Sequence, residues 1–564
     1  MGYICNNKQI IEMKTICIIM LLSFVATAQE TELGWAKGMG STSNDVGVSS
    51  AVDTLGNVYT TGLFVGTVDF DPGVGVYNLT SIGESDIFIQ KLDADGNFVW
   101  AKSMGSASSE GGRSIAIDAS GNVYTTGVFR ETVDFDPGAG VYNLISQGAT
   151  DIFVQKLDTD GNFAWANRMG GSGIDIGESV AVDYLGNVYT TGSFLGTVDF
   201  DPGMEVYNLT SQGGADTFTQ KLDTDGNFVW AKSVEGSHAD NGRSIAVDTS
   251  GNVYTAGTFI GTADFDPGAG VYYLSSEGDM DIFIQKLDTN GNFVWAKSMG
   301  GINWDYGYSV AVDVSGNVYT TGSFRETVDF DPGAGIYNLT SQGGTDIFIQ
   351  KLDADGNFVW ANRMGGSTGD NGRSIAVDIL GNVYTTGSFR GTIDFDPGMG
   401  IHLLSSAGWE DIFIQKLDAN GDFVWAKSMG STDSDTGYSI VIDILGNIYT
   451  SGVFRETVDF DPEAGVYNLI SEGGTDIFVH KLMQVPLNVS DINQTSLKFY
   501  PNPVKDILYF DEEIQKVTIT DITGKVLSTH SNSSQVDMSG FQYGLYLIVI
   551  ETENGKEMRK IVKR

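Results

Sequence analysis

The stretch Asp281–Gly301, DIFIQKLDTNGNFVWAKSMGG, decides the fold, because close copies of it return along the chain at a constant spacing. Its tryptophan recurs every 65 residues without a slip, at Trp35, Trp100, Trp165, Trp230, Trp295, Trp360 and Trp425. The glycine of GNVYTTG and the proline of DFDP keep the same step. A fixed period of this length is the signature of a repeat architecture. The sequence therefore predicts seven equal units without an insertion or deletion.

Each unit has the pattern of antiparallel strands joined by tight turns. Apolar residues alternate with a period of two, and Gly-Asn or Asp-Gly steps separate the runs, which is typical of hairpins. We expect four strands per unit, represented by SIAVD, NVYTTGSF, DIFIQKLD and NFVWAKS, and one or two short strands between the second and the third. Seven such units favour an all-β fold, a seven-bladed β-propeller that protects its sheet edges by closing into a ring.

The two ends of the repeat region predict how this ring closes. The region begins with a lone copy of the fourth strand, at Gly34–Lys37, and the last unit stops after its third strand, at Leu482. We expect the N-terminal strand to complete the last sheet. An open stack of repeats would instead carry unlike capping units at its ends.

The composition excludes several classes of protein. The 564 residues include 72 acidic and 32 basic side chains, for a formal charge of -40, and 41% of them are hydrophobic. This is too apolar for a disordered acidic tail. A nucleic-acid partner is not expected, because phosphate binding needs clustered Lys and Arg. We expect a monomer.

The first 28 residues have the pattern of a secretory signal peptide. Lys14 precedes an apolar run, Ile16–Val25, and the small residues up to Ala28 form a cleavage site. The pattern begins at Met13, which suggests that residues 1–12 are not translated. The run is shorter than the roughly 20 residues of a membrane span, and no later stretch is long and apolar enough to form one.

Both cysteines, Cys5 and Cys17, lie in the segment that would be removed. The mature chain is therefore expected to have no disulfide and no thiolate metal site.

The repeated patterns AVDxxGNVYTTG and DIFIQKLDxxGNFVWAKSMGG resemble those of the bacterial seven-bladed β-propeller repeat family of secreted proteins, over residues 33–482. The resemblance implies a fold and an extracellular setting, but no single activity. The expected organisation is a signal peptide at 1–28, a propeller at 29–482, a linker at 483–497 and a C-terminal module at 498–564.

The C-terminal module resembles the type A C-terminal sorting domain of type IX secretion. The residues that carry this resemblance are Pro501, Asn502, Pro503, Asp506, Gly524, Gly544 and Tyr546, followed by a basic end. The resemblance implies a small β-sandwich that engages the type IX machinery and crosses the outer membrane of a Gram-negative bacterium. The protein would then be released or attached to the cell surface. An ordinary terminal β-domain, such as a carbohydrate-binding module, is the alternative.

Paired aspartates in every DFD motif are candidate metal ligands. Alternate residues of an extended segment share a face, so that both carboxylates could bind one hard cation such as Ca²⁺. The alternative is a tight turn in which the carboxylates cap backbone amides. The pairs are Asp69 and Asp71, Asp134 and Asp136, Asp199 and Asp201, Asp264 and Asp266, Asp329 and Asp331, Asp394 and Asp396, and Asp459 and Asp461.

A second set of acidic residues enters the first strand of each unit. We expect these residues to form a loop surface that attracts cations and polycationic partners, or merely to solvate a secreted protein. They are Asp45, Glu110, Asp175, Asp240, Asp305, Asp370 and Asp435.

The candidate ligand-binding residues are those at which the units differ. The first strand should line the propeller axis, so the variable residues next to it should surround the mouth of the channel. Arg and Tyr there suit carboxylates, sugars or peptide, whereas drift at exposed positions is the alternative. The candidates are Arg113, Glu178, Arg243, Trp304, Tyr308, Arg373 and Tyr438.

No catalytic residues are assigned. The chain has four histidines, none of which recurs in the repeats, so no His-ligated metal site or Ser-His pairing is visible. We expect an exported, non-catalytic binding or adhesion protein for an extracellular protein or glycan. A secreted polysaccharide hydrolase or lyase that uses channel carboxylates is the alternative.

Overall fold

The computed structural model describes residues 31–484, 499–500, 504–520, 526–542, 544–552 and 555–563. The predicted signal peptide and almost all of the predicted linker lie outside these residues. The chain divides into two compact units, residues 1–486 and 487–564. Within the described residues, no helix is long and apolar enough to cross a membrane.

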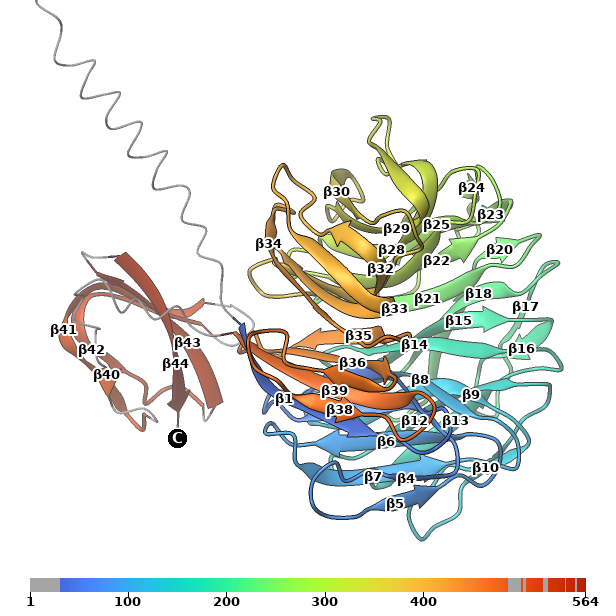
Figure 1. Cartoon of the computed structure of the whole chain (residues 1–564), viewed down its shortest axis with the longest axis horizontal. Coiled ribbons are helices and arrows are strands. Elements are labelled where there is room, and N and C mark those ends of the chain that lie inside the picture. Colours follow the sequence, from blue (N-terminus) through green and yellow to red (C-terminus); the bar gives the residue numbers. More distant parts are fainter. Residues whose placement is uncertain are drawn as a thin grey trace, which may run out of the picture. The chain divides into compact units, whose positions relative to one another are not determined.

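The described part of the first unit contains seven four-stranded antiparallel sheets (Figure 1). In order from the first strand to the fourth, they are β2 (Val46–Val52), β3 (Val58–Phe64), β6 (Asp86–Leu92) and β7 (Phe98–Met104); β8 (Gly111–Ile117), β9 (Val123–Phe129), β12 (Asp151–Leu157) and β13 (Phe163–Met169); β14 (Ile176–Val182), β15 (Val188–Phe194), β18 (Asp216–Leu222) and β19 (Phe228–Ser233); β21 (Asn241–Val247), β22 (Val253–Phe259), β25 (Asp281–Leu287) and β26 (Phe293–Met299); β27 (Tyr306–Val312), β28 (Val318–Asp329), β29 (Asn338–Leu352) and β30 (Phe358–Met364); β31 (Asn371–Val377), β32 (Val383–Asp394), β33 (Leu403–Leu417) and β34 (Phe423–Met429); and β35 (Thr436–Ile442), β36 (Ile448–Phe454), β39 (Asp476–Gln484) and β1 (Thr31–Met39).

The first strands of the sheets form a closed ring. Each contacts the first strand of the next sheet, in the order β2, β8, β14, β21, β27, β31 and β35, and β35 contacts β2. The N-terminal strand β1 pairs with β39, with Trp35 opposite Lys481. The all-β repeat fold and its completion by the N-terminal strand are thus confirmed.

Short ribbons extend the sheets between the second and third strands, as predicted. They are β4 (Thr67–Asp69) with β5 (Asn78–Thr80), β10 (Thr132–Asp134) with β11 (Asn143–Ile145), β16 (Thr197–Asp199) with β17 (Asn208–Thr210), β23 (Thr262–Asp264) with β24 (Tyr273–Ser275) and β20 (Glu235–Gly236), and β37 (Thr457–Asp459) with β38 (Asn468–Ile470). In two sheets the ribbon is continuous with the long strands β28 and β29, or β32 and β33.

The hydrophobic core lies between successive sheets. Tyr59 of β3 and Trp100 of β7 pack in one cluster with Val123 and Phe129 of the next sheet. The rings of Tyr59 and Trp100 are 6.2 Å apart and meet edge to face, a favourable arrangement for aromatic pairs. The Nζ atom of Lys91 lies 4.9 Å from the centre of the Tyr59 ring. Because the same residues return in each unit, every sheet packs on its neighbour in the same way.

The second unit is a separate β-structure. Its strands are β40 (Phe499–Tyr500), β41 (Ile507–Thr520), β42 (Val526–Asp537), β43 (Gly544–Thr552) and β44 (Gly555–Lys563). The long strand β41 pairs with β40, β42 and β43, and the connected strands enclose their own apolar cluster. Tyr546 is buried at its edge and donates a hydrogen bond to the carbonyl of Gln542. Pro501, Asn502, Pro503 and Gly524 lie outside the described residues.

Candidate functional site

A β-bulge in every first strand places the candidate residues. The antiparallel register skips one residue between a glycine and a serine in each of these strands. A bulge leaves the extra residue unpaired and re-aims its side chain. The seven bulged residues and the serines that follow them line one cavity of about 210 Å³ at the centre of the ring. The bulged residues are Val48, Arg113, Glu178, Arg243, Tyr308, Arg373 and Tyr438, and we call this site the axial mouth.

The serines of the axial mouth hold neighbouring first strands together. Ser114 Oγ accepts a hydrogen bond from the backbone N–H of Val180 at 3.1 Å. Equivalent bonds run around the ring, and the last one joins Ser439 Oγ to the N–H of Ser50 at 3.1 Å. These serines therefore join each first strand to the next, and the bulged residues supply the charged and aromatic side chains of the cavity.

Arginine and tyrosine side chains stack along one side of the axial mouth. The guanidinium carbons of Arg243 and Arg373 lie 5.5 Å and 4.6 Å from the centre of the Tyr308 ring, within the range of cation–π attraction. Tyr306 stacks on Tyr308 with ring centres 5.5 Å apart. The Nε atoms of Arg243 and Arg373 are buried and have no hydrogen-bond partner in the described protein. Both side chains line the central cavity, so their guanidinium groups supply positive charge to it.

The only acidic bulged residue already has a cationic neighbour. Glu178 lies 3.6 Å from Arg113 (Oε2 to Nη1), and the Arg113 side chain is 43% exposed. A half-exposed pair of this kind contributes little to stability. Arg113 thus neutralises Glu178. The axial mouth keeps a net positive charge, which comes from Arg243 and Arg373.

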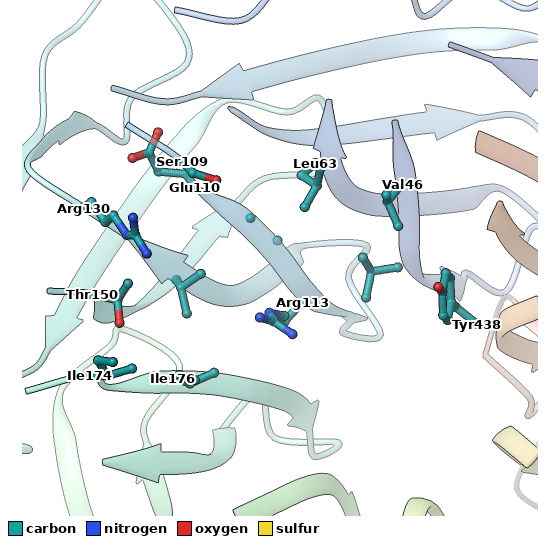
Figure 2. Close-up of a pocket in the computed structure, with 14 residues that line it drawn as sticks. Val46, Leu63, Ser109, Glu110, Arg113, Arg130, Thr150, Ile174, Ile176 and Tyr438 are labelled. Atoms are coloured by element: carbon teal, nitrogen blue, oxygen red, sulfur yellow. The ribbon is translucent and has the colours of Figure 1, made fainter. Parts of the chain in front are cut away.

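A larger cavity of about 560 Å³ adjoins the axial mouth on one side and shares Val48, Arg113 and Tyr438 with it (Figure 2). Its apolar wall contains Val46, Leu63, Val128, Ile174 and Ile176, and Glu110, Arg113 and Arg130 supply charge. We call it the side pocket. It breaks the sevenfold symmetry of the ring.

One glycine makes room for the side pocket. Gly111 lines it, whereas the equivalent positions carry Val46, Ile176, Asn241, Tyr306, Asn371 and Thr436. A Cβ atom on Gly111 would lie 3.5 Å from the nearest atom of Leu63, so a side chain would fit there and occupy the space. Sequence reasoning did not single out Gly111 or Arg130, although the loss of a side chain at a repeated position was a visible signal.

Trp304 does not join the other candidates. Its side chain is 58% exposed, and it lines neither the axial mouth nor the side pocket. The other six predicted ligand-binding residues lie together at the axial mouth. Their binding role stays a prediction.

The DFD aspartates accept hydrogen bonds from their own turns. Asp69 Oδ1 accepts from the backbone N–H groups of Asp71 and Tyr77, at 3.0 and 2.7 Å, and Asp71 Oδ1 accepts from Gly73 at 2.8 Å. This is the geometry of the turn alternative, and the other units repeat it. Across the part of the chain that the structure describes, no group of three or more His, Cys, Asp or Glu side chains is arranged to hold a metal ion. Calcium binding by these pairs stays a prediction.

The second acidic set does not form a surface, which corrects the expectation from the sequence. All seven side chains are buried. Asp175 shows why, because its Oδ2 and Oδ1 accept hydrogen bonds from the backbone N–H groups of Gly171 and Leu195, at 2.8 and 2.9 Å. The position of these residues in loops suggested that their side chains are exposed. They are buried because a carboxylate such as that of Asp175 accepts hydrogen bonds from backbone N–H groups of two separate loops.

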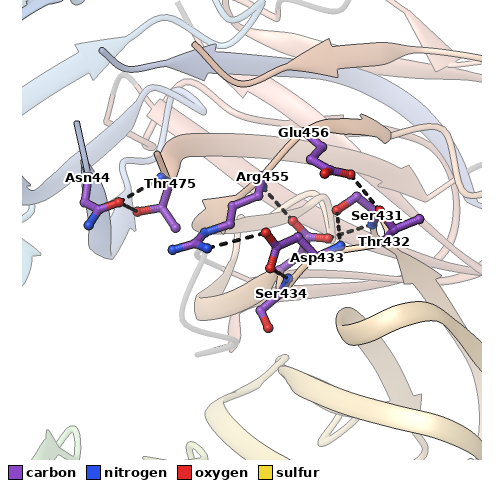
Figure 3. A network of polar contacts seen from close by, with 9 residues as sticks. Asn44, Ser431, Thr432, Asp433, Ser434, Arg455, Glu456 and Thr475 are labelled. Atoms are coloured by element: carbon purple, nitrogen blue, oxygen red, sulfur yellow. Dashed lines mark hydrogen bonds and ion pairs between the residues drawn. The ribbon is translucent and has the colours of Figure 1, made fainter. Parts of the chain in front are cut away.

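Burial changes the acidity of this second acidic set. Loss of hydration raises the pKa of Asp305 to about 7, although backbone N–H groups of Arg325 and Gly301 oppose the shift. Figure 3 shows one of these loops, in which Asp433 pairs with Arg455 at 3.4 Å and Thr432 donates to Glu456. The acidic loops are thus tied to the neighbouring segments and are not free to gather cations at the surface.

Comparisons with known families agree with this architecture. A family model described as a secretion system C-terminal sorting domain matches residues 498–564. A model described as a beta-propeller repeat matches residues 164–193, 229–258, 359–388 and 425–453. The chain therefore carries β-propeller repeats followed by a type IX sorting domain, as the sequence predicts, and is directed to secretion or to the bacterial cell surface.

Individual relatives are distant. An uncharacterised WD repeat-containing protein of Acanthamoeba polyphaga mimivirus is 23% identical over 507 residues, which cover 75% of this chain and 36% of the relative. Regulatory protein FlaEY of Caulobacter vibrioides is 26% identical over 226 residues, which cover 39% of this chain and 22% of that protein. The chain thus spans about a third or less of the length of these curated relatives.

Solved structures are similar only in part. Sqt1 from Chaetomium thermophilum has a TM-score of 0.36 and 11% identity, with 81% of this chain and all of that chain covered. Rhamnogalacturonan lyase YesW has a TM-score of 0.27 and 11% identity, with 94% and 91% covered. Similarity at this level transfers neither protein's activity to this chain.

Proposed function

We propose that this chain, a set of β-propeller repeats with a type IX sorting domain, is an exported binding protein that holds carboxylate groups of an extracellular glycan or protein at its axial mouth. It is exported across the outer membrane of a Gram-negative bacterium and is either released or kept at the cell surface. One observation carries the proposal: two arginines that contact the same tyrosine ring line one cavity in a chain of formal charge -40.

The chemistry of the axial mouth favours a carboxylate over a phosphate-rich polymer. A guanidinium group matches a carboxylate through two parallel hydrogen bonds. The Tyr308 ring contacts both guanidinium groups and holds them at the cavity by cation–π attraction. Outside the cavity, the overall negative charge of the protein would repel a polyanion. A ligand with few, well-placed carboxylates therefore fits best.

The side pocket supports a ligand with an apolar part. Its wall is mostly aliphatic, and its entrance shares Arg113 with the axial mouth. A carboxylate held by the arginines could thus place a neighbouring apolar group beside Ile174 and Ile176. Clefts of this size and composition are usual for small ligands or chain ends.

Charge at the axial mouth supports binding over catalysis. A glycosidase needs two carboxyl groups on either side of the reacting bond. Glu178 is the only acidic residue among those that line the central cavity, and Arg113 neutralises it. The alternative, a secreted polysaccharide hydrolase or lyase, would have to use residues elsewhere.

Calorimetric titration of the full chain tests the proposal. The first probe is a short oligogalacturonate of two or three sugars, which carries one carboxylate per sugar and therefore only a few in total, and its control is a neutral oligogalactan of equal length. We expect binding of the acidic probe only, with an affinity that falls as salt is raised, and no cleavage products after prolonged incubation. Equal binding of both probes would argue against a carboxylate site, and product formation would favour the enzyme.

A further inference from the structure

The side pocket offers apolar surface from three successive sheets. Val46 and Leu63 come from the first sheet and Val128 from the second, whereas Ile174 and Ile176 come from the segment that leads into β14 and from its first residue. All five side chains are at least partly exposed, and Ile174 is 52% exposed. Covering apolar surface of this kind with a ligand is favourable. The cavity of about 560 Å³ is therefore suited to an aliphatic group.

Arg130 supplies a positive charge that the protein itself does not use. It follows β9 directly, its side chain is exposed, and it lines the side pocket. Its side chain makes no hydrogen bond or ion pair with the described residues. Its counterpart in the last sheet, Arg455, pairs with Asp433 at 3.4 Å. The residue equivalent to Asp433 in the second sheet is Ser108, which carries no charge. The charge of Arg130 is thus free for a ligand.

The charged residues of the side pocket lie at different distances from the axial mouth. In Figure 2, Arg130 lies at the end of the pocket that faces away from Tyr438, and Arg113 lies between the two. Glu110 is held by its own loop, because its two oxygens accept hydrogen bonds from the N–H and the hydroxyl of Ser106, at 2.8 and 2.7 Å. A ligand with its anionic end at Arg130 would therefore extend past Arg113 toward the axial mouth.

These features match the carboxyl-terminal end of a polypeptide better than a free fatty acid. A guanidinium group pairs with a carboxylate through two parallel hydrogen bonds, and capture of a terminal carboxylate is a recurring mode of peptide recognition. Beyond Arg113, the axial mouth is lined by arginine, tyrosine and serine side chains. Such groups can bind the backbone amides of the preceding residues, whereas a hydrocarbon tail would bury them without partners.

We infer that the side pocket binds the carboxyl-terminal end of an extracellular protein. The terminal carboxylate pairs with Arg130, and an aliphatic last side chain packs against Ile174 and Ile176. The inference rests on the proposed function only for the part of the ligand that enters the axial mouth. Because Arg130 does not line the axial mouth, the two sites can be tested separately.

The test uses the full chain and a fluorescent hexapeptide of glycine and serine that ends in leucine with a free carboxylate. We expect this peptide to bind about tenfold more tightly, or better, than the same peptide with an amidated end, because amidation removes the charge that faces Arg130. A peptide that ends in glycine should be weaker by a similar factor, because it has no aliphatic side chain. Isocaproate, a free acid with the leucine side chain, should compete only weakly. Fluorescence anisotropy measures each affinity.

Two variants assign the binding to the side pocket. Gly111→Ile copies Ile176, the equivalent residue of the next sheet, so it should fold like the parent, fill the pocket and weaken peptide binding by about tenfold or more. Arg130→Ala should weaken binding of the free-carboxylate peptide about tenfold and leave the affinity for the amidated peptide unchanged. Arg325→Ala is the matched control, since it changes the same position in a sheet that carries Tyr306 in place of Gly111. It should bind the peptide like the parent.

The outcomes separate this inference from the proposed function. Equal binding of the free and amidated peptides, or of one peptide by parent and Gly111→Ile, overturns the inference. Isocaproate binding as tight as that of the peptide also overturns it and assigns the pocket to free acids. If oligogalacturonate binds and the peptide does not bind at millimolar concentration, the inference fails and the proposed function stands. If the peptide binds through Arg130 and oligogalacturonate does not bind, the inference stands and the carboxylate site at the axial mouth fails.

Discussion

Replacing Arg243 and Arg373 by alanine should lower the affinity of the full chain for oligogalacturonate by roughly 100-fold or more. The two guanidinium groups flank Tyr308 and line the axial mouth. Hydrogen bonds that involve charged groups each contribute about 1.5–3 kcal/mol, so loss of two such contacts removes most of the binding energy of a small ligand. Titration calorimetry of parent and variant measures the difference.

A variant with the same change in charge separates a local effect from a general one. Arg325 and Arg390 lie near the outer ribbons and line neither cavity of the candidate site. Arg325→Ala/Arg390→Ala should change the affinity less than about twofold, since charges that lie away from the binding cavity are screened by salt. An equal loss in both double variants would mean that the probe responds only to the overall charge.

His480→Gln should stabilise the propeller, and the gain should grow as the pH falls. At this position the other six sheets carry a glutamine whose Nε2 donates to a phenylalanine carbonyl, as Gln415 does to Phe395 at 2.6 Å. His480 is buried, and neither ring nitrogen has a hydrogen-bond partner in the described residues. Glutamine should restore the missing bond, for a gain of about 1 kcal/mol at pH 7.

The pH dependence follows from burial of this imidazole, which lowers the pKa of His480 from 6.5 to about 4. Between these values the unfolded chain binds a proton that the folded chain does not, so acid favours unfolding. The penalty at pH 5 is about 2 kcal/mol, and His480→Gln removes it. Thermal unfolding at pH 7 and pH 5 measures both effects, and Gln415→His should produce the reverse change. An equal gain at the two pH values would contradict the assignment.

The repeat made most of the fold predictable. The tryptophan that recurs at a fixed spacing and the apolar residues that alternate with a period of two correctly located the strands. The repeat region begins with an extra fourth strand and ends without one, which correctly predicted that β1 completes the sheet of β39. The expectation that the first strand lines the axis also correctly placed Arg113 and its equivalents at the central cavity. The bulge that turns them toward the axis could not be predicted, because a bulge depends on how two strands pair, and the Gly-x-Ser step that recurs at its place does not by itself specify that pairing.

The candidate site was less accessible to sequence reasoning. Asp45 and its equivalents looked like solvated loop residues, yet they are buried and bind backbone amides. Sequence reasoning assigned no role to Asp86 and its equivalents, which open the third strand of each sheet, although each leaves a buried carboxylate oxygen without a partner in the described residues. Polar residues of this kind can be assigned only when their hydrogen bonds are known. Gly111 differs from these residues, because its sequence signal was visible without the structure. At its position in the regular repeat it alone lacks a side chain, and it lies at the side pocket.

Amide hydrogen exchange of the full chain, with and without saturating oligogalacturonate, tests the central claim most directly. If the axial mouth is the binding site, the bound probe should slow exchange at the bulges of β21, β27 and β31, whose extra residues do not take part in the regular strand pairing. Exchange in the outer ribbons and in the second unit should stay the same. Protection confined to those regions, with no change at the three bulges, would contradict the account.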